Sequence, residues 1–138
     1  MEDIINQEVE NLENASPEQL ANKIAEILDN KKAKNIEPLE ETIDDMVMIL
    51  RDRHTKRLKS GACSIASGLV FMESLTYLER ASDQCSSIAV SMLARTNDRI
   101  MEDHHDYLRE IHLSNDVSYL AERERRREQY VKPLKEIQ

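Results

Sequence analysis

The sequence contains few of the residues that build turns and sheets. It has only two glycines, three prolines and no tryptophan, and aromatic residues make up 4% of its 138 positions. β-Sheets need frequent tight turns and favour aromatic and β-branched side chains, so this composition argues against them. Leucine, methionine, alanine, glutamate, lysine and arginine are abundant instead, and these residues favour helices. The composition therefore predicts an all-α fold.

A basic surface charge is also missing. The formal net charge is −8, and an acidic chain lacks the positive footprint that nucleic-acid binding requires, so we expect no nucleic-acid partner. The one basic cluster alternates with glutamates, and it consists of Arg123, Arg125, Arg126 and Arg127. This alternation is typical of a solvated helix with ion pairs between neighbouring turns.

Long apolar runs and cysteine motifs are absent as well. The longest uncharged stretch, residues 60–72, is too short to cross a bilayer, and the acidic start is not that of a signal peptide. Cys63 and Cys85 have neither zinc-site nor disulfide-framework spacing, which favours buried, reduced thiols in a cytosolic compartment. Any link to a membrane must then come through another chain or a further segment.

Capping signals divide the first part of the chain. Ser16 followed by Pro17 is a favourable helix start and predicts a helix over residues 17–28, with residues 29–32 as a connection. We expect its buried side to carry Leu20, Ile24 and Leu28. A shorter amphipathic segment is expected before it, with the apolar residues Ile4, Ile5, Val9 and Leu12.

Two long helices are expected in the middle of the chain. Alternating spacings of four and three predict a helix that ends at Ser60 and Gly61, with a seam formed by Leu39, Ile43, Met46, Leu50 and His54. Ser64 can cap the next helix, which is expected to run to about Ala94. Its apolar residues are Ile65, Leu69, Met72, Leu75, Leu78, Ile88 and Met92.

Two further helices are expected after breaks at residues 96–98 and 114–116. The first should carry Ile100, Tyr107, Leu108 and Ile111, and the second Val117, Leu120 and Tyr130 before it meets Pro133. Long helices joined by short polar breaks pack as antiparallel neighbours. We therefore predict a single domain over residues 1–138, an antiparallel three-helix bundle with short flanking helices.

Acidic pairs on two consecutive helices carry the most chemical information. Glu79 and Asp83 are four residues apart and so lie on one side of their helix, and Glu40 and Asp44 repeat this spacing on the preceding helix. Carboxylates on an apolar stripe are costly unless protons, basic side chains or metal ions compensate them. Arg51 is among the basic residues that could form ordinary ion pairs there.

If the two pairs face each other, four carboxylates converge. We therefore take Glu79, Asp83, Glu40 and Asp44 as candidate metal ligands. A further pair, Glu41 and Asp45, is expected to face solvent.

Four stretches resemble the PhoU-like domain at the C-terminus of sodium/phosphate cotransporter family proteins. They are residues 35–44 (NIEPLEETID), 53–58 (RHTKRL), 61–68 (GACSIASG) and 75–89 (LTYLERASDQCSSIA). The resemblance covers about residues 20–112, which leaves residues 1–16 as an N-terminal extension and residues 114–138 as a C-terminal helix. The order and spacing of the four stretches are more specific for this family than a single pair of acids.

The resemblance implies a three-helix PhoU unit whose E/DxxxD motifs bind metal clusters, with iron or zinc as the metals. Glu79 and Asp83 match this motif, and Glu40 and Asp44 match the companion acids of the neighbouring helix. Gln84 and Ser87 stand where relatives often carry histidine and asparagine.

The function implied by this resemblance is the regulation of phosphate uptake. The expected partner is a membrane phosphate transporter, either in the same polypeptide or as a separate chain. The expected location is cytoplasmic, at the cytoplasmic face of the inner membrane. A homodimer is also compatible with the sequence, because one three-helix unit with this much apolar surface leaves part of a face uncovered.

The alternatives are a free-standing helical scaffold without metal, and a di-metal carboxylate enzyme. Glu102 and His105 supply one ExxH pair, but di-iron bundles use two such pairs and further glutamates, and no second pair occurs. The exposed start of a helix is the simpler explanation of His104 and His105. The chain also has no glycine-rich phosphate loop, so we expect that it is not an enzyme.

Overall fold

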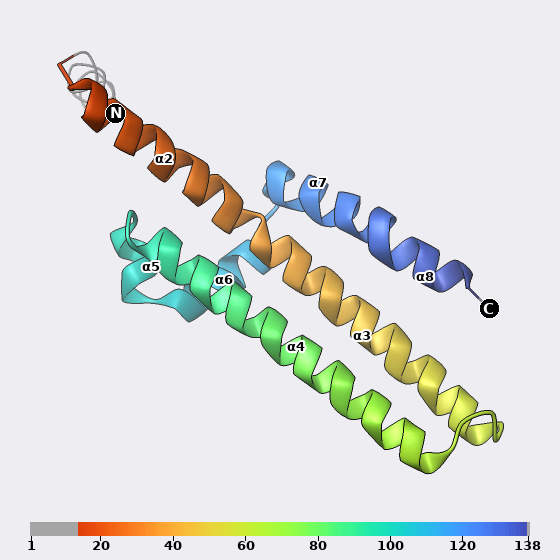
Figure 1. Cartoon of the computed structure of the whole chain (residues 1–138). Helices are drawn as coiled ribbons and strands as arrows, with labels where there is room; N and C mark the ends of the chain where they lie inside the picture. Colours follow the sequence, from red (N-terminus) through yellow and green to blue (C-terminus); the bar gives the residue numbers. More distant parts are fainter. Residues whose placement is uncertain (1–13, 138) are drawn as a thin grey trace. The chain divides into compact units, whose positions relative to one another are not determined.

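Helices form all the regular secondary structure in the described part of the chain. The computed structural model describes residues 14–137, so the segment expected at Ile4, Ile5, Val9 and Leu12 lies outside the described residues. The helices are α2 (Pro17–Lys34), α3 (Ile36–Lys59), α4 (Ile65–Ala94), α5 (Asp98–Glu102), α6 (His104–Leu113), α7 (Val117–Arg126), the π-helical turn η1 (Arg127–Val131) and α8 (Lys132–Glu136). The predicted all-α class is confirmed (Figure 1).

The chain divides after Lys32 into two compact units. In the first unit, the Ser16 hydroxyl accepts a hydrogen bond from the Gln19 amide, which is the expected cap of α2. The helix does not end at Leu28 as predicted, because residues 29–32 contain no glycine or proline and their two lysines favour helix.

The buried stripe predicted for α2 is also wrong. Leu20, Ile24 and Leu28 are 36%, 59% and 53% exposed. Since α2 is the only helix described in the first unit, no other described helix of that unit covers these side chains. The amphipathic pattern therefore predicted the helix correctly but did not predict the exposure of its apolar side chains.

In the second unit, α3 and α4 form an antiparallel hairpin. α3 ends at Lys59, and Gly61 makes the turn with a φ of +73°, a left-handed conformation that glycine adopts without a steric penalty. Ser64 then caps α4 by accepting a hydrogen bond from the Ser67 amide. Both helix boundaries agree with the prediction from sequence.

The chain from α7 to α8 packs along α3 and runs parallel to it. Arg123 and Arg127 of this segment pair with Glu41 and Asp45 of α3, and the Arg53 guanidinium donates to the Ile137 carbonyl oxygen. Arg123, Arg127 and Ile137 follow one another along the chain in the same order as their partners on α3, which are Glu41, Asp45 and Arg53. The two segments therefore run in the same direction. α3, α4 and α7 thus follow the up-down-up order of a three-helix bundle, with α3 in the middle (Figure 1).

The last helix does not stop at Pro133. It continues to Glu136, and a π-helical turn precedes the proline, in which the Lys132 amide donates to the Arg127 carbonyl oxygen. Proline removes one helical donor and crowds the carbonyl four residues earlier, and a wider turn accommodates that crowding. Tyr119 and Val131 form the buried side of this segment, whereas the predicted Val117, Leu120 and Tyr130 are exposed.

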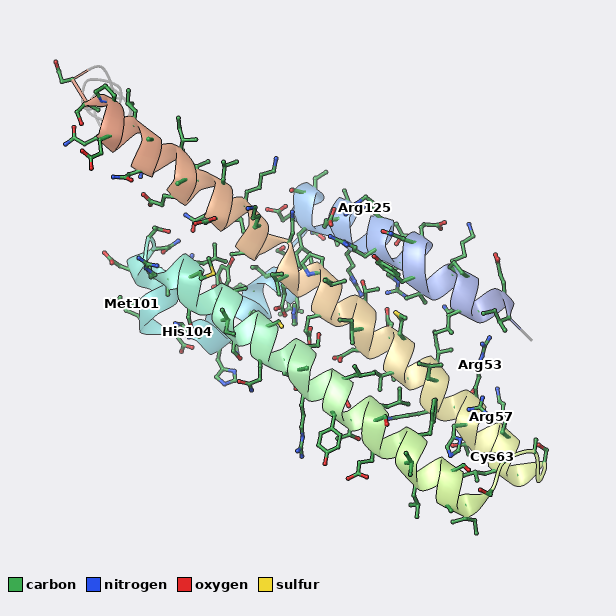
Figure 2. The ribbon with its side chains drawn as sticks, in the orientation of Figure 1. Arg53, Arg57, Cys63, Met101, His104 and Arg125 are labelled. Atoms are coloured by element: carbon green, nitrogen blue, oxygen red, sulfur yellow. The ribbon has the colours of Figure 1, made fainter. Side chains whose placement is uncertain are left out.

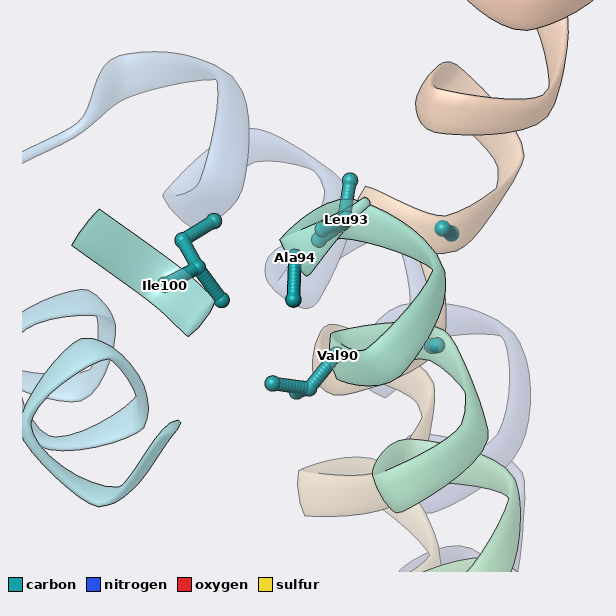
Figure 3. Close-up of a cluster of buried hydrophobic side chains, with 6 residues drawn as sticks. Val90, Leu93, Ala94 and Ile100 are labelled. Atoms are coloured by element: carbon teal, nitrogen blue, oxygen red, sulfur yellow. The ribbon is translucent and has the colours of Figure 1, made fainter. Parts of the chain in front are cut away.

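A small apolar cluster joins the end of α4 to the short helices. Its buried members are Ala33, Ala89, Val90, Leu93, Ala94 and Ile100 (Figure 3). Tyr107 and Leu108 of α6 pack against it. The helix predicted through Ile100 and Ile111 is in fact two, because Asp103 is extended and its side chain caps α6 by accepting from the Asp106 amide. This break turns α6 back towards α3.

The inner face of α4 is richer in small residues than the predicted apolar stripe. Its buried residues are Gly68, Leu75, Ser82, Ser86, Ala89, Val90, Leu93 and Ala94. Of the seven apolar residues predicted for α4, Leu75 is buried and Met72 is half-buried, whereas Ile65, Leu69, Leu78, Ile88 and Met92 are exposed. Small side chains let α3 and α4 approach closely, and a simple apolar count does not find such a face.

The two cysteines differ in their exposure to solvent. Cys63 is half-buried, but Cys85 is exposed, so the prediction of two buried thiols is wrong for Cys85. Among the described residues, no helix combines the length and the apolar character needed to cross a bilayer.

Candidate metal centre

A cleft of ≈ 470 Å³ opens between α3, α4, α6 and α7 in the second unit. Among the described residues that line it, six are acidic, whereas two, Arg123 and His112, are basic. The full lining consists of Glu37, Glu40, Glu41, Asp44, Asp45, Asp83, Ser86, Leu108, His112 and Arg123. This cleft therefore has the composition of a cation site.

Three of the four predicted ligands come together in this cleft. Glu40 and Asp44 lie one turn apart on α3, and Asp83 faces them from α4. One carboxylate oxygen from each residue lies within 4.8 Å of the other two. We call Glu40, Asp44 and Asp83 the carboxylate triad.

Glu79, the fourth predicted ligand, is not part of this group. Its Oε2 lies 2.6 Å from Nη2 of Arg51, in an ion pair in which each side chain is about one-third exposed. The same arginine lies near the hydroxyl of Thr76. Glu79 thus forms an ordinary ion pair with Arg51, one of the basic residues expected to compensate these acids.

The electrostatics of the triad favour a bound cation or proton. Burial, followed by the charges of Asp44 and Glu37, raises the pKa of Glu40 to about 8. Burial and the charge of Glu79 also raise the pKa of Asp44. At neutral pH, Glu40 therefore keeps a proton unless a cation compensates the cluster.

The donor atoms suit a hard metal ion. Carboxylate oxygens are preferred by ions such as Mg²⁺, Ca²⁺ and Mn²⁺, whereas zinc sites usually include nitrogen or sulfur ligands. Oδ1 of Asp44 is buried and has no hydrogen-bond partner among the described residues. An unpartnered buried carboxylate oxygen is costly in an apo protein and is a natural ligand atom, so the residues present fit a divalent ion.

A second polar network forms the wall of the cleft beside the triad. Glu37 is buried, with Oε1 2.6 Å from Nε2 of His112, and its Oε2 accepts a hydrogen bond from the Ser86 hydroxyl. These contacts tie α3 to α4 and α6. Because both oxygens of Glu37 have partners, this carboxylate is a structural connection that also adds negative charge beside Glu40.

The acids predicted to face solvent instead pair with arginines of α7 and η1. Glu41 and Asp45 are half-buried, and they match Arg123 and Arg127, which have the same four-residue spacing. Arg123 Nε lies 2.7 Å from Glu41 Oε2 without hydrogen-bond alignment, and Arg127 Nη1 lies 3.1 Å from Asp45 Oδ2. Burial, followed by the charge of Glu41, raises the pKa of the nearby Tyr119.

The other arginines of the basic cluster behave as predicted. Arg125 and Arg126 pair with Glu122 on their own helix, at distances of 2.6 and 2.8 Å. The cluster thus divides into two arginines that stay on α7 and two that cross to α3. Only the second pair contributes to the bundle.

The single ExxH pair does not take part in the cleft. His104 is exposed at the start of α6 (Figure 2), and His105 is exposed as well, as the simpler explanation predicted. The histidine that does reach the cleft is His112.

Sequence reasoning missed Glu37, Ser86, His112 and the role of Arg123. Glu37 could have been found, because it precedes Glu40 and Asp44 by three and seven residues and so shares their helix face. His112 and Arg123 reach the cleft only because α6 and α7 fold back onto α3. No spacing in the sequence reports that contact.

No family model, no curated protein and no solved structure matches this chain.

Proposed function

We propose that this chain is a PhoU-like regulatory module, and not an enzyme, that binds a divalent metal ion and controls phosphate uptake by a membrane transporter. The transporter is either part of the same polypeptide or a separate chain. The proposed place of action is the cytoplasmic face of the membrane.

The observation that supports metal binding most directly is the carboxylate triad. Three carboxylates from two helices approach within 4.8 Å of one another, and the pKa of Glu40 is raised to about 8. Such a cluster is poorly stable without a positive charge at its centre. Glu40, Asp44 and Asp83 would hold the ion, which would neutralise the cluster and draw α3 and α4 together.

Glu79 has a supporting place in this proposal. It lies close enough to raise the pKa of Asp44, while Arg51 holds it beside α3. Iron or zinc would follow from the family resemblance, whereas the all-oxygen triad favours manganese, magnesium or ferrous iron over zinc.

The phosphate half of the proposal is supported by the resemblance of residues 35–44, 53–58, 61–68 and 75–89 to PhoU-like domains. A regulatory role is also supported by the number of helices that line the cleft. Residues from α3, α4, α6 and α7 line one cavity, so a change of charge at the triad acts on the contacts between all four helices. A bundle that responds in this way can alter a surface that a partner recognises.

Metal analysis of the purified protein tests the binding half. Cells are grown with iron, zinc, manganese and magnesium available, and metal content per chain is measured by mass spectrometry for the wild type and for Asp44→Asn with Asp83→Asn. We expect bound metal in the wild type and its loss in the double variant. The exposed Glu73→Gln on the same helix as Asp83 is the matched control and should keep the metal. A wild-type protein that carries none of these metals contradicts the proposal.

Phosphate uptake in the source cells tests the regulatory half. We expect removal of the chain to change the rate of labelled phosphate uptake, and Asp44→Asn with Asp83→Asn to reproduce that change at normal protein abundance. Uptake that is the same with and without the chain, at both low and high external phosphate, would exclude this role.

A further inference from the structure

α4 has a second, outward face that no described residue of the second unit covers. On the side opposite its buried residues, seven positions follow one another at spacings of three or four residues. We call them the outer stripe: Val70, Ser74, Tyr77, Ala81, Cys85, Ile88 and Met92. All seven are exposed, including Val70 at 66%, Tyr77 at 59% and Ile88 at 61%, and none carries a charge. This spacing is that of a helix–helix seam.

The side-chain sizes along the outer stripe are complementary to those of a second, antiparallel copy of the stripe. Ala81 lies at the centre, and the other positions lie four, seven and eleven residues to either side of it. An antiparallel second copy centred on Ala81 would place Tyr77 against Cys85 and Ser74 against Ile88. Large side chains would then face small ones next to the centre, and Ala81 would face its own copy where the two helices approach most closely.

A parallel second copy would lack this complementarity. It would place Tyr77 against Tyr77 and Ile88 against Ile88, while the small Ser74 and Cys85 would face themselves and leave gaps. The side-chain sizes therefore select the antiparallel arrangement.

The length of the outer stripe is sufficient for pairing but not for a permanent assembly. Val70 and Met92 are separated by about 33 Å along the helix, at about 1.5 Å per residue. One helix seam of this length covers less than the roughly 800 Å² per partner of a standard interface. A dimer formed in this way should therefore dissociate reversibly on dilution.

We propose that the outer stripe of α4 is the contact surface for a second copy of this chain, with the two α4 helices antiparallel and the two-fold axis at Ala81. The triad lies on the other side of α4 from this contact, facing α3. Dimerisation thus leaves the metal cleft open.

Sedimentation and light scattering of the full chain test the contact. We expect a reversible dimer at millimolar chain concentration, and we expect Ile88→Glu to raise the dissociation constant by at least about tenfold, because it buries an unpaired charge. The matched control is Ile65→Glu, which changes an equally apolar, 77% exposed residue of the same helix off the outer stripe. A monomeric wild type, or a dimer that Ile88→Glu leaves intact, overturns the proposal. Helical content measured by circular dichroism verifies that both variants fold.

Disulfide trapping tests the direction and the register. In a Cys63→Ser, Cys85→Ser background, Ala81→Cys should form a disulfide-linked dimer under mild oxidation, because the two new thiols meet at the axis. In Cys63→Ser alone, Cys85 should remain unlinked, since an antiparallel pair separates the two Cys85 positions by about 12 Å along the helices, beyond the reach of a disulfide. Linkage through Cys85, or no linkage through Ala81→Cys, overturns the antiparallel arrangement.

Discussion

Replacing Glu40 by glutamine should change how the stability of the metal-free protein depends on pH. The pKa of Glu40 is raised from 4.5 to about 8 by burial and by its acidic neighbours. Between these two values the folded protein holds a proton that the unfolded chain has lost. The stability that Glu40 contributes is therefore fully present at and below the lower pKa and is lost as the pH rises through about 8.

The size of this effect can be bounded from the shift. A shift of this size corresponds to an upper limit of about 5 kcal/mol at about 1.4 kcal/mol per pH unit. Glu40 is half-buried, so solvent screening reduces the expected effect to about 2 kcal/mol. Glutamine has nearly the same shape and cannot ionise, so Glu40→Gln should lack this part of the pH dependence.

Urea denaturation of the metal-free wild type and Glu40→Gln, from about pH 5 to about pH 9, measures the difference. We expect the variant to gain about 2 kcal/mol relative to the wild type over this range. Glu73→Gln, at an exposed position, is the control and should follow the wild type at every pH. Parallel profiles for the wild type and Glu40→Gln would refute the claim that Glu40 ionises against its neighbours.

Three other substitutions test contacts that stabilise the helices of the second unit. Gly68→Ala should destabilise the protein by about 1–3 kcal/mol, because the new methyl carbon would lie 2.7 Å from Nε2 of the buried His54. Chemical denaturation should show a smaller loss of stability when Gly68→Ala is made in a His54→Ala background, where the crowded ring is absent. Arg127→Gln should cost up to about 1 kcal/mol by removing the ion pair with Asp45, and hydrogen exchange should report faster opening of η1 and the adjoining end of α7 with little change in α4. Ser64→Ala should lower the free energy of unfolding by about 1 kcal/mol, because the α4 cap is lost. A variant whose thermal unfolding midpoint equals that of the wild type would contradict this.

Much of the fold was predictable because its signals are local. The turn at Gly61 and the cap at Ser64 each depend on a few consecutive residues, and both were placed correctly. The end of α2 was misplaced because polar residues such as Asp29 and Asn30 resemble a connection yet continue a helix. The division at Asp103 was missed because one extended residue interrupts an otherwise helical pattern.

The candidate site was predictable only in part. Residues four apart on one helix must share a face, so the pairs containing Glu40 and Asp83 were found from spacing alone. Spacing does not show which acids already have basic partners. Glu79 was therefore included although Arg51 pairs with it, and Glu41 was assigned to solvent although Arg123 reaches it from a helix more than eighty residues later.

Calorimetric titration of the metal-free protein with Mn²⁺ tests the central claim most directly. We expect Mn²⁺ to bind the wild type, and to bind more tightly as the pH rises towards 8, because Glu40 must release its proton to the solvent when the ion binds. Binding should be lost in Asp44→Asn and kept in Glu73→Gln. Absence of binding by the folded wild type at a pH where Glu40 is ionised, or equal binding by Asp44→Asn, would contradict the central claim.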